Sequence, residues 1–239
     1  MRRIPILMYH QIDTPPARGT PLRGLVVSPR SFSWQMRMLG LMGYTGVSMR
    51  DLEPYLAGKK SGKVVGITFD DGYQNNLQYA LPVLLRHRFT ATCYGVSQLI
   101  GGTNIWDEGK VGQKPLMNQQ EWRQWRDAGM DIGSHTRTHA KLTELPAIEA
   151  RDEIANSKAE LEQAIGCEVR HFCYPYGWFS TEHEEMVRDA GYVTATTTRR
   201  GRVCTGDNTY ALRRIMVARA TNPLQFFMKI ATAYEDRRA

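Results

Sequence analysis

Short runs of apolar residues alternate along the chain with longer stretches in which apolar residues recur at helical spacing. Several short runs, such as Val64–Phe69, are apolar without strict alternation, as expected for strands that are covered on both faces. We predict eight strands in this way: Ile4–Tyr9, Thr45–Ser48, Val64–Phe69, Ala91–Val96, Asp131–Ser134, His171–Tyr174, Val193–Thr197 and Leu212–Val217. Strands that alternate with helices indicate βα units around a parallel sheet or barrel.

Capping signals indicate where the intervening helices begin and end. Helix starts are predicted at Ser28-Pro29, at Asn118 with Glu121, at Pro146, at Thr181 with Glu184 and at Asn222-Pro223, and helix ends near Gly43, Gly129, Gly166 and Gly191. The stretch 97–116 shows no regular pattern and contains four glycines. Long loops of this kind inside compact domains are often functional lids, and the sequence leaves open whether this segment is one.

Size and composition favour one domain. A chain of 239 residues with 42% hydrophobic content can bury one sizeable core, as a single α/β barrel or as two small domains. We expect a single domain over residues 1–239. The apolar stretch near the N-terminus spans only about five residues, which is short for a signal peptide. The four cysteines are widely spaced and form no CxxC pair, which is typical of reduced thiols. We therefore predict a cytoplasmic protein, with the inner face of the membrane as an alternative.

A formal net charge of +7 and a pI near 9.3 indicate an anionic partner or simply a solvated basic surface. The candidate partners are a nucleic acid, an anionic membrane surface touched peripherally, and a phosphate-linked sugar carrier. The arginines show none of the aromatic interleaving that is typical of a single-strand binding groove, so we expect no nucleic acid partner.

Two adjacent carboxylates, Asp70 and Asp71, follow the predicted strand Val64–Phe69. At the C-terminal end of a barrel strand, polar residues converge on one face. Because neighbouring side chains at a strand end diverge, one carboxylate can face a metal ion while the other faces a water held by that ion. The alternative is a helix N-cap or a turn, since Asp-Gly is a frequent turn sequence.

Two histidines, His135 and His139, follow another predicted strand and lie four residues apart. In a helical turn this spacing brings both imidazoles to the same side, as in two-histidine metal sites. The alternative is a surface pair without a metal. Together with the aspartates, the histidines describe a His₂Asp site with open coordination positions, which is how a catalytic zinc or similar divalent ion is held. We expect Zn²⁺, with Co²⁺ or Ni²⁺ as alternatives, and a hydrolytic reaction in which the free carboxylate activates water.

Three stretches in this order, TFDDG (68–72), SHTRTHAKL (134–142) and YPYG (174–177), resemble the polysaccharide deacetylase family, the NodB-homology group of carbohydrate esterases. The resemblance spans roughly residues 4–217. It implies a single distorted (β/α) barrel of TIM-like type with about seven parallel strands. It also implies a metal-dependent enzyme that removes acetyl groups from N-acetylated amino sugars. By position, Asp70 becomes the general base, and Asp71, His135 and His139 become the metal ligands.

Two departures from the family pattern concern the remaining catalytic groups. Pro175, Tyr176 and Gly177 match the third motif, and Tyr176 is expected to lend its backbone N–H to the oxyanion. Cys173 occupies the position of the arginine that orients the base in many members. The last motif reads LRRI (212–215) and lacks the usual acid histidine. The MYHQI stretch (8–12) resembles a branch that includes exopolysaccharide deacetylases and has FxYPYG, and by this resemblance His10 takes the role of the acid.

Two tryptophans, Trp106 in the long loop and Trp178 after the YPYG turn, are candidates for stacking on a sugar ring. We expect Pro175, Gly177 and both tryptophans to contribute to substrate binding. The predicted substrate is an acetamido sugar of a cell-surface glycan or of its lipid- or nucleotide-linked precursor. Alternative functions are hydrolysis of a cyclic amide, an imide or a sugar O-acetyl ester, and a catalytically inactive glycan-binding remnant. The oligomeric state is left open by the sequence.

Overall fold

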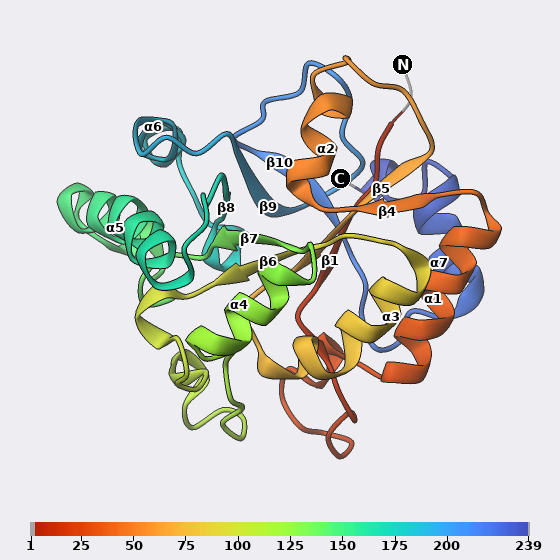
Figure 1. Cartoon of the computed structure of the whole chain (residues 1–239), viewed down its shortest axis with the longest axis horizontal. Helices are drawn as coiled ribbons and strands as arrows, with labels where there is room; N and C mark the ends of the chain where they lie inside the picture. Colours follow the sequence, from red (N-terminus) through yellow and green to blue (C-terminus); the bar gives the residue numbers. More distant parts are fainter. Residues whose placement is uncertain (1–2, 239) are drawn as a thin grey trace.

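Parallel strands close into a barrel in the computed structural model, which describes residues 3–238 (Figure 1). Eight strands follow one another in the order β1-β10-β9-β8-β7-β6-β5-β4, and β1 also pairs with β5, which closes seven of them into a ring. The strand bounds are β1 Ile6–Tyr9, β4 Thr45–Val47, β5 Val64–Phe69, β6 Thr92–Gly95, β7 Asp131–Ser134, β8 His171–Cys173, β9 Thr194–Arg200 and β10 Leu212–Met216. The predicted seven-stranded (β/α) barrel is confirmed.

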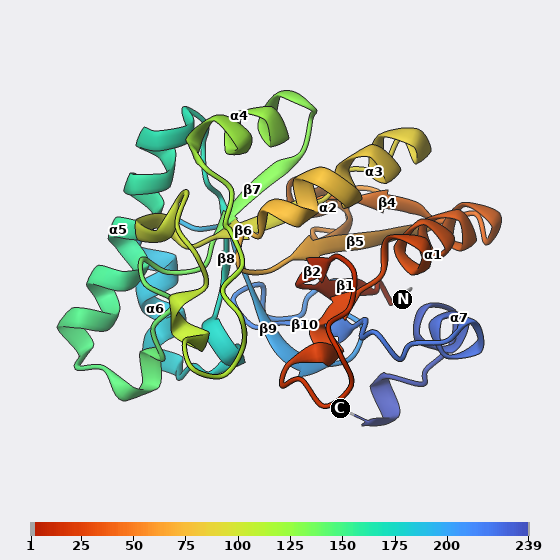
Figure 2. The same cartoon turned by 90° about the horizontal axis from the view of Figure 1, so that it is seen from below.

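Helices cover the outside of the barrel (Figures 1 and 2). Their bounds are α1 Pro29–Leu41, α2 Met49–Leu56, α3 Leu81–His87, α4 Gln119–Asp127, α5 Ala147–Ile165, α6 Thr181–Asp189 and α7 Pro223–Ala231. The predicted cap of α4 is correct, because Asn118 and Glu121 form a reciprocal capping box. The predicted cap of α6 is wrong by one residue. Ser180 is the N-cap, and His183 rather than Glu184 completes the box by accepting from the Ser180 backbone N–H.

The core lies between the barrel and its helices, and its composition follows from burial of the strands on both faces. All six residues of β5 are buried, as are the four residues of β1. In α5, Ala150, Ile154, Leu161 and Ile165 recur at helical spacing and form a buried stripe. These contacts fix the strands relative to one another, so the residues that follow the strand ends are held in a defined arrangement.

Two segments lie at the same end of the barrel, the lower edge in Figure 1. One follows β1 and contains the short paired strands β2 Gln11–Ile12 and β3 Val26–Val27, which the sequence analysis missed. The other is 97–116, which contains the 3₁₀ turns Ser97–Leu99 and Ile105–Asp107. An isolated β-bridge between Tyr73 and Leu116 attaches the second segment to the residues that follow β5. A further bridge, between Thr103 and Pro115, lies within the segment.

The four cysteines, Cys93, Cys167, Cys173 and Cys204, are free thiols. Within residues 3–238, no helix combines the length and the apolar composition that a bilayer crossing requires.

Candidate active site

His10 and Asp70 emerge side by side because β1 and β5 are parallel and in register. Tyr9 is paired with Phe69, the last residues of the two strands, and the Asp70 backbone N–H donates to the Tyr9 carbonyl at 3.0 Å. The His10 Nε2 atom lies 3.9 Å from the Asp70 Oδ2 atom. His10 is partly exposed, whereas the Asp70 side chain is 4% exposed. The structure therefore brings the expected acid and base together at the edge of a cavity.

A buried arginine from β10 holds Asp70. Both terminal nitrogens of Arg214 donate to the carboxylate, Nη1 to Oδ1 at 2.6 Å and Nη2 to Oδ2 at 2.7 Å. Burial opposes ionisation of Asp70, but the charge and hydrogen bonds of Arg214 outweigh it, so the pKa of Asp70 lies below its usual range. Arg214 also donates to the Cys173 Sγ atom at 3.2 Å. The guanidinium that the sequence lacks at position 173 is thus supplied from another strand, directly beside the thiol.

Asp71, His135 and His139 form a buried cluster that could hold a divalent cation. The Asp71 Oδ1 atom lies 3.4 Å from the Nε2 atom of each histidine, and one ligand atom from each of the three residues lies within 4.8 Å of the others. Ligand atoms about 2.0–2.1 Å from a tetrahedral zinc ion lie roughly 3.4 Å apart. The spacing of these atoms therefore fits a metal ion of that size.

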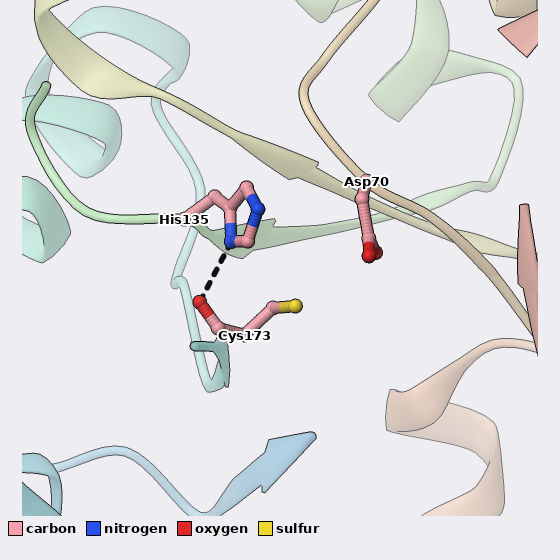
Figure 3. Close-up of side chains that lie close together, drawn as sticks. All are labelled: Asp70, His135 and Cys173. Carbon is pink, nitrogen blue, oxygen red and sulfur yellow. Dashed lines mark hydrogen bonds between the residues drawn. The ribbon is translucent and has the colours of Figure 1, made fainter. Parts of the chain in front are cut away.

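The second nitrogen of each histidine has its own partner. The His135 Nδ1 atom is 2.7 Å from the Cys173 carbonyl oxygen, which faces the imidazole in Figure 3 while the thiol does not. The His139 Nδ1 atom is 3.2 Å from the Tyr176 hydroxyl. Such outer hydrogen bonds orient metal-binding imidazoles and leave Nε2 free for the ion. The donor set thus has the chemistry of a metal centre as well as its spacing.

Asp70, His135 and Cys173 also lie close together (Figure 3). This second group does not offer a cation site, because the Arg214 guanidinium contacts both the Asp70 carboxylate and the Cys173 sulfur. A fixed positive charge in that position repels a metal ion. The candidate cation site of this region is therefore the Asp71, His135 and His139 cluster.

Backbone strain concentrates at the same residues. Asp71, His139 and Tyr176 have φ angles of 75°, 63° and 59°, in the left-handed region that side chains other than glycine seldom adopt. Such strain is typical of functional sites whose surroundings impose the conformation. At Gly177, with φ of 72°, an added Cβ atom would lie 2.0 Å from the Thr198 Oγ1 atom. Glycine is therefore required beside Tyr176.

The cluster opens into a cavity of about 220 Å³. Its lining includes His10, Asp70, Asp71, Trp106, Asp107, His135, His139, Tyr174, Tyr176 and Thr198. The Trp106 ring is stacked on the His139 imidazole, with 4.4 Å between ring centroids. Trp178 lies outside this lining, is 48% exposed and contacts the Tyr176 ring. Pro175 and Gly177 form the turn that carries Tyr176.

Comparison of this chain with known proteins agrees with this geometry. The sequence profile of the family described as polysaccharide deacetylase matches residues 57–195, which include the two aspartates, the two histidines and the YPYG turn. This chain belongs to the polysaccharide deacetylase family. It is therefore a carbohydrate deacetylase, which is a hydrolase, as the resemblance predicted.

Alignments with individual relatives cover most of this chain. YxkH of Bacillus subtilis is 29% identical over 218 residues, which are 90% of this chain and 72% of that protein. The poly-beta-1,6-N-acetyl-D-glucosamine N-deacetylase of Staphylococcus epidermidis is 24% identical over 206 residues, covering 82% of this chain and 70% of that protein. The structure of IcaB from Ammonifex degensii superimposes with a TM-score of 0.80 at 25% identity, covering 97% of each chain.

Two residues of the site were missed by the sequence analysis. The sequence analysis gave Arg214 no role of its own, although Arg214 and Leu212, two residues earlier in the same strand, are both buried. Residues two apart in a strand lie on the same face, so an arginine two residues after an apolar strand residue is the signal that could have singled it out. Asp107 is a third buried carboxylate of the cavity, after Asp70 and Asp71, and its pKa is raised by burial and by the charge of Asp71. Its segment has no regular pattern, so nothing in the sequence pointed to it.

Proposed function

We propose that this enzyme is a metal-dependent N-deacetylase that removes the acetyl group from a GlcNAc-type amino sugar and releases acetate. The observation that carries the proposal is the convergence, in one cavity, of three metal-ligand atoms and an ion-paired carboxylate. The N-deacetylase activity of the Staphylococcus epidermidis relative supports the N-acetylated sugar as substrate. The two departures of the sequence, at Cys173 and at the last motif, support assignment to the branch that has the histidine after the first strand.

Asp71, His135 and His139 would hold the divalent ion, for which Zn²⁺ is the first choice. When bound, such an ion would supply Lewis acidity and would lower the pKa of a water molecule from its bulk value to about 7. Asp70 removes the proton of the attacking water, and Arg214 keeps that carboxylate ionised and fixes both of its oxygens. The new C–O bond forms at the acetyl carbon as this proton moves to Asp70.

His10 completes the reaction on the amine side. An amine leaves as a neutral group only if its nitrogen receives a proton, and histidine supplies one near neutral pH. His10 lies 3.9 Å from Asp70 at the edge of the same cavity, so it can protonate the nitrogen as the C–N bond breaks. The Tyr176 backbone N–H donates to the oxyanion. The products are acetate and a free amino sugar.

The proposal extends to the setting of the enzyme. Residues 1–239 form one deacetylase domain, and the substrate is an amino sugar of a cell-surface glycan or of its lipid- or nucleotide-linked precursor. Four free thiols are typical of a reducing compartment, which supports a cytoplasmic location. Cell fractionation tests this location, and recovery of the enzyme outside the inner membrane would contradict it.

Acetate release tests the proposed activity. Metal-stripped enzyme is assayed on free, nucleotide-linked and lipid-linked N-acetylated sugars before and after addition of zinc or cobalt. Release that depends on the added metal would support N-deacetylation and identify the substrate class. No release from any of these sugars, despite stoichiometric metal uptake, would contradict it and would favour cyclic amides, sugar esters or a binding role.

A further inference from the structure

A second cavity, of about 240 Å³, adjoins the metal-site cavity. Five residues line both: His10, Leu22, Leu25, Asp71 and Asp107. The exposed surface of this cavity is mainly apolar, and away from the shared wall it includes the aliphatic side chains of Pro16, Pro21, Val26 and Val111 alongside polar side chains. A substrate held at the metal-site cavity can therefore extend directly into a compartment with a mainly apolar surface.

Two loops enclose this second cavity: the segment 13–26 after β1 and the segment 107–114. Both lie at the same end of the barrel in Figure 1. The Lys114 Nζ atom lies 2.9 Å from the Asp13 Oδ2 atom, and this ion pair joins the two loops. Leu22 stands at the junction of the cavities with a φ angle of 56° and a side chain that is 45% exposed. A strained backbone that keeps an apolar side chain exposed points to a binding role for Leu22.

Arginines gather where the first of these loops borders the cavity. Arg23 lines the cavity, and its Nε atom donates to the Pro16 carbonyl at 2.6 Å. The Arg219 backbone N–H donates to the Gly24 carbonyl at 2.8 Å, which places Arg219 beside Arg23. Desolvation and the charges of Arg219 and Arg18 lower the pKa of Arg23. Across residues 3–238, none of these three arginines has a carboxylate within 4.0 Å.

The Nε bond fixes the Arg23 guanidinium and leaves its two terminal nitrogens without a partner in the described part of the chain. A guanidinium group with unpartnered terminal nitrogens binds phosphate oxygens well, because its N–H donors match the geometry of the anion. A second sugar ring suits the cavity less. Most of the cavity surface is apolar, so many hydroxyl groups of the ring would lose water without gaining partners.

We propose that the second cavity is a substrate subsite for a phosphate that carries an aliphatic chain. The phosphate contacts Arg23 with Arg18 and Arg219 nearby, the chain lies against Leu22, Leu25 and Val111, and the acetamido group reaches the metal site. The substrate is then a glycosyl phosphate esterified with an aliphatic alcohol. This inference rests on the proposed function and narrows its substrate to one class of carrier.

Three substrates test the subsite with the zinc-loaded enzyme. They are the methyl glycoside of N-acetylglucosamine, N-acetylglucosamine 1-phosphate, and the decyl ester of N-acetylglucosamine 1-phosphate. We expect kcat/KM to rise by about tenfold with the phosphate and again with the chain. The variant Arg23→Gln should reduce the ratio of kcat/KM for the decyl phosphate to that for the methyl glycoside by about tenfold. The matched control is Arg37→Gln, on the exposed side of α1, which should leave this ratio unchanged.

The possible outcomes separate this inference from the proposed function. Equal kcat/KM for all three substrates would overturn the subsite and leave N-deacetylation intact. Equal values for the phosphate with and without the chain would also overturn it, because the anion would then be a simple sugar phosphate. If no substrate is cleaved, the proposed function fails, and binding of decyl phosphate measured by calorimetry still tests the subsite. Weaker binding to Arg23→Gln than to wild type supports the subsite, and no binding to wild type overturns it.

Discussion

Arg214 and Asp70 form a buried, two-point ion pair across 144 residues of sequence. Arg214 is 1% exposed and Asp70 is 3% exposed, so the carboxylate exchanges its water shell for one guanidinium. Asp70 lines the cavity that contains the metal-ligand cluster, and Arg214 contacts this carboxylate. This ion pair therefore contributes to the stability of the barrel and also keeps Asp70, the expected base, ionised and oriented.

Replacement of Arg214 by Met should affect both stability and activity. An unpaired carboxylate in a buried site costs about 3–5 kcal/mol of unfolding free energy. The turnover rate should fall by at least about 100-fold, because Asp70 loses its orientation. Arg213→Met is the matched control, since Arg213 belongs to the same strand but is exposed, and it should change stability by no more than about 0.5 kcal/mol.

Urea unfolding and acetate release measure the two effects of Arg214→Met. Arg214→Lys keeps the charge and loses the two-point contact, so it should retain more stability than Arg214→Met and still lose turnover. Wild-type turnover in Arg214→Lys would contradict an orienting role for the guanidinium.

The Asp70 ion pair also predicts a pH dependence of stability. The pKa of Asp70 is lowered in the folded chain, whereas an unfolded aspartate titrates near about 3.9. The stabilisation is therefore fully present above the unfolded pKa and is lost as pH falls through the lower folded pKa. We expect the difference in unfolding free energy between metal-stripped wild type and Asp70→Asn to be constant near neutral pH and to shrink below about pH 4. A difference that stays constant down to pH 2 would exclude this linkage.

Loss of one cluster histidine should remove the metal. His139→Ala leaves two of the three ligand atoms, so the purified variant should bind zinc with much lower affinity and release little acetate. His87→Ala is the control, because His87 lies at the C-terminal end of α3, away from the cluster. Zinc content measured by atomic absorption checks both variants. Stoichiometric, tightly bound zinc in His139→Ala would show that the metal site lies elsewhere.

Removal of the expected acid should separate catalysis from metal binding. His10→Gln should lower the turnover rate by roughly 100-fold or more, since protonation of the departing amine typically contributes that much. Zinc content should remain at the wild-type level because His10 is outside the ligand cluster. Assays on the acetamido sugar and metal analysis measure the two quantities. Unchanged turnover would assign the proton donor to another group, such as Asp107.

Gly177 offers a test of the turn that carries Tyr176. In Gly177→Ala, the strained φ angle of 72° and the clash with Thr198 should together lower the unfolding free energy by roughly 3 kcal/mol. Gly109 has a similar φ of 77° with nothing within 4 Å of an added Cβ atom, so Gly109→Ala should cost only about 1 kcal/mol. Thermal or urea unfolding of the two variants provides the comparison. Equal losses would mean that the Thr198 contact relaxes without cost.

Local patterns in the sequence determined much of this molecule. The strand Val64–Phe69 was predicted with its observed bounds, because an apolar run of this length followed by Asp-Asp-Gly leaves little choice of where the strand ends. The grouping of Asp71 with His135 and His139 was also predicted, since residues that follow parallel strands converge at one end of a barrel. These features depend on short-range periodicity and on the residue types required to bind a metal.

Only the tertiary structure decided which arginine serves Asp70. Barrel closure brings β10 against β1 and thus directs Arg214 at a carboxylate far away in sequence, which no local pattern reveals. The same holds for the joining of the 13–26 and 107–114 loops by Asp13 and Lys114, which creates the second cavity. Such pairings depend on how strands close and loops meet in space, and that information is distributed over the whole chain.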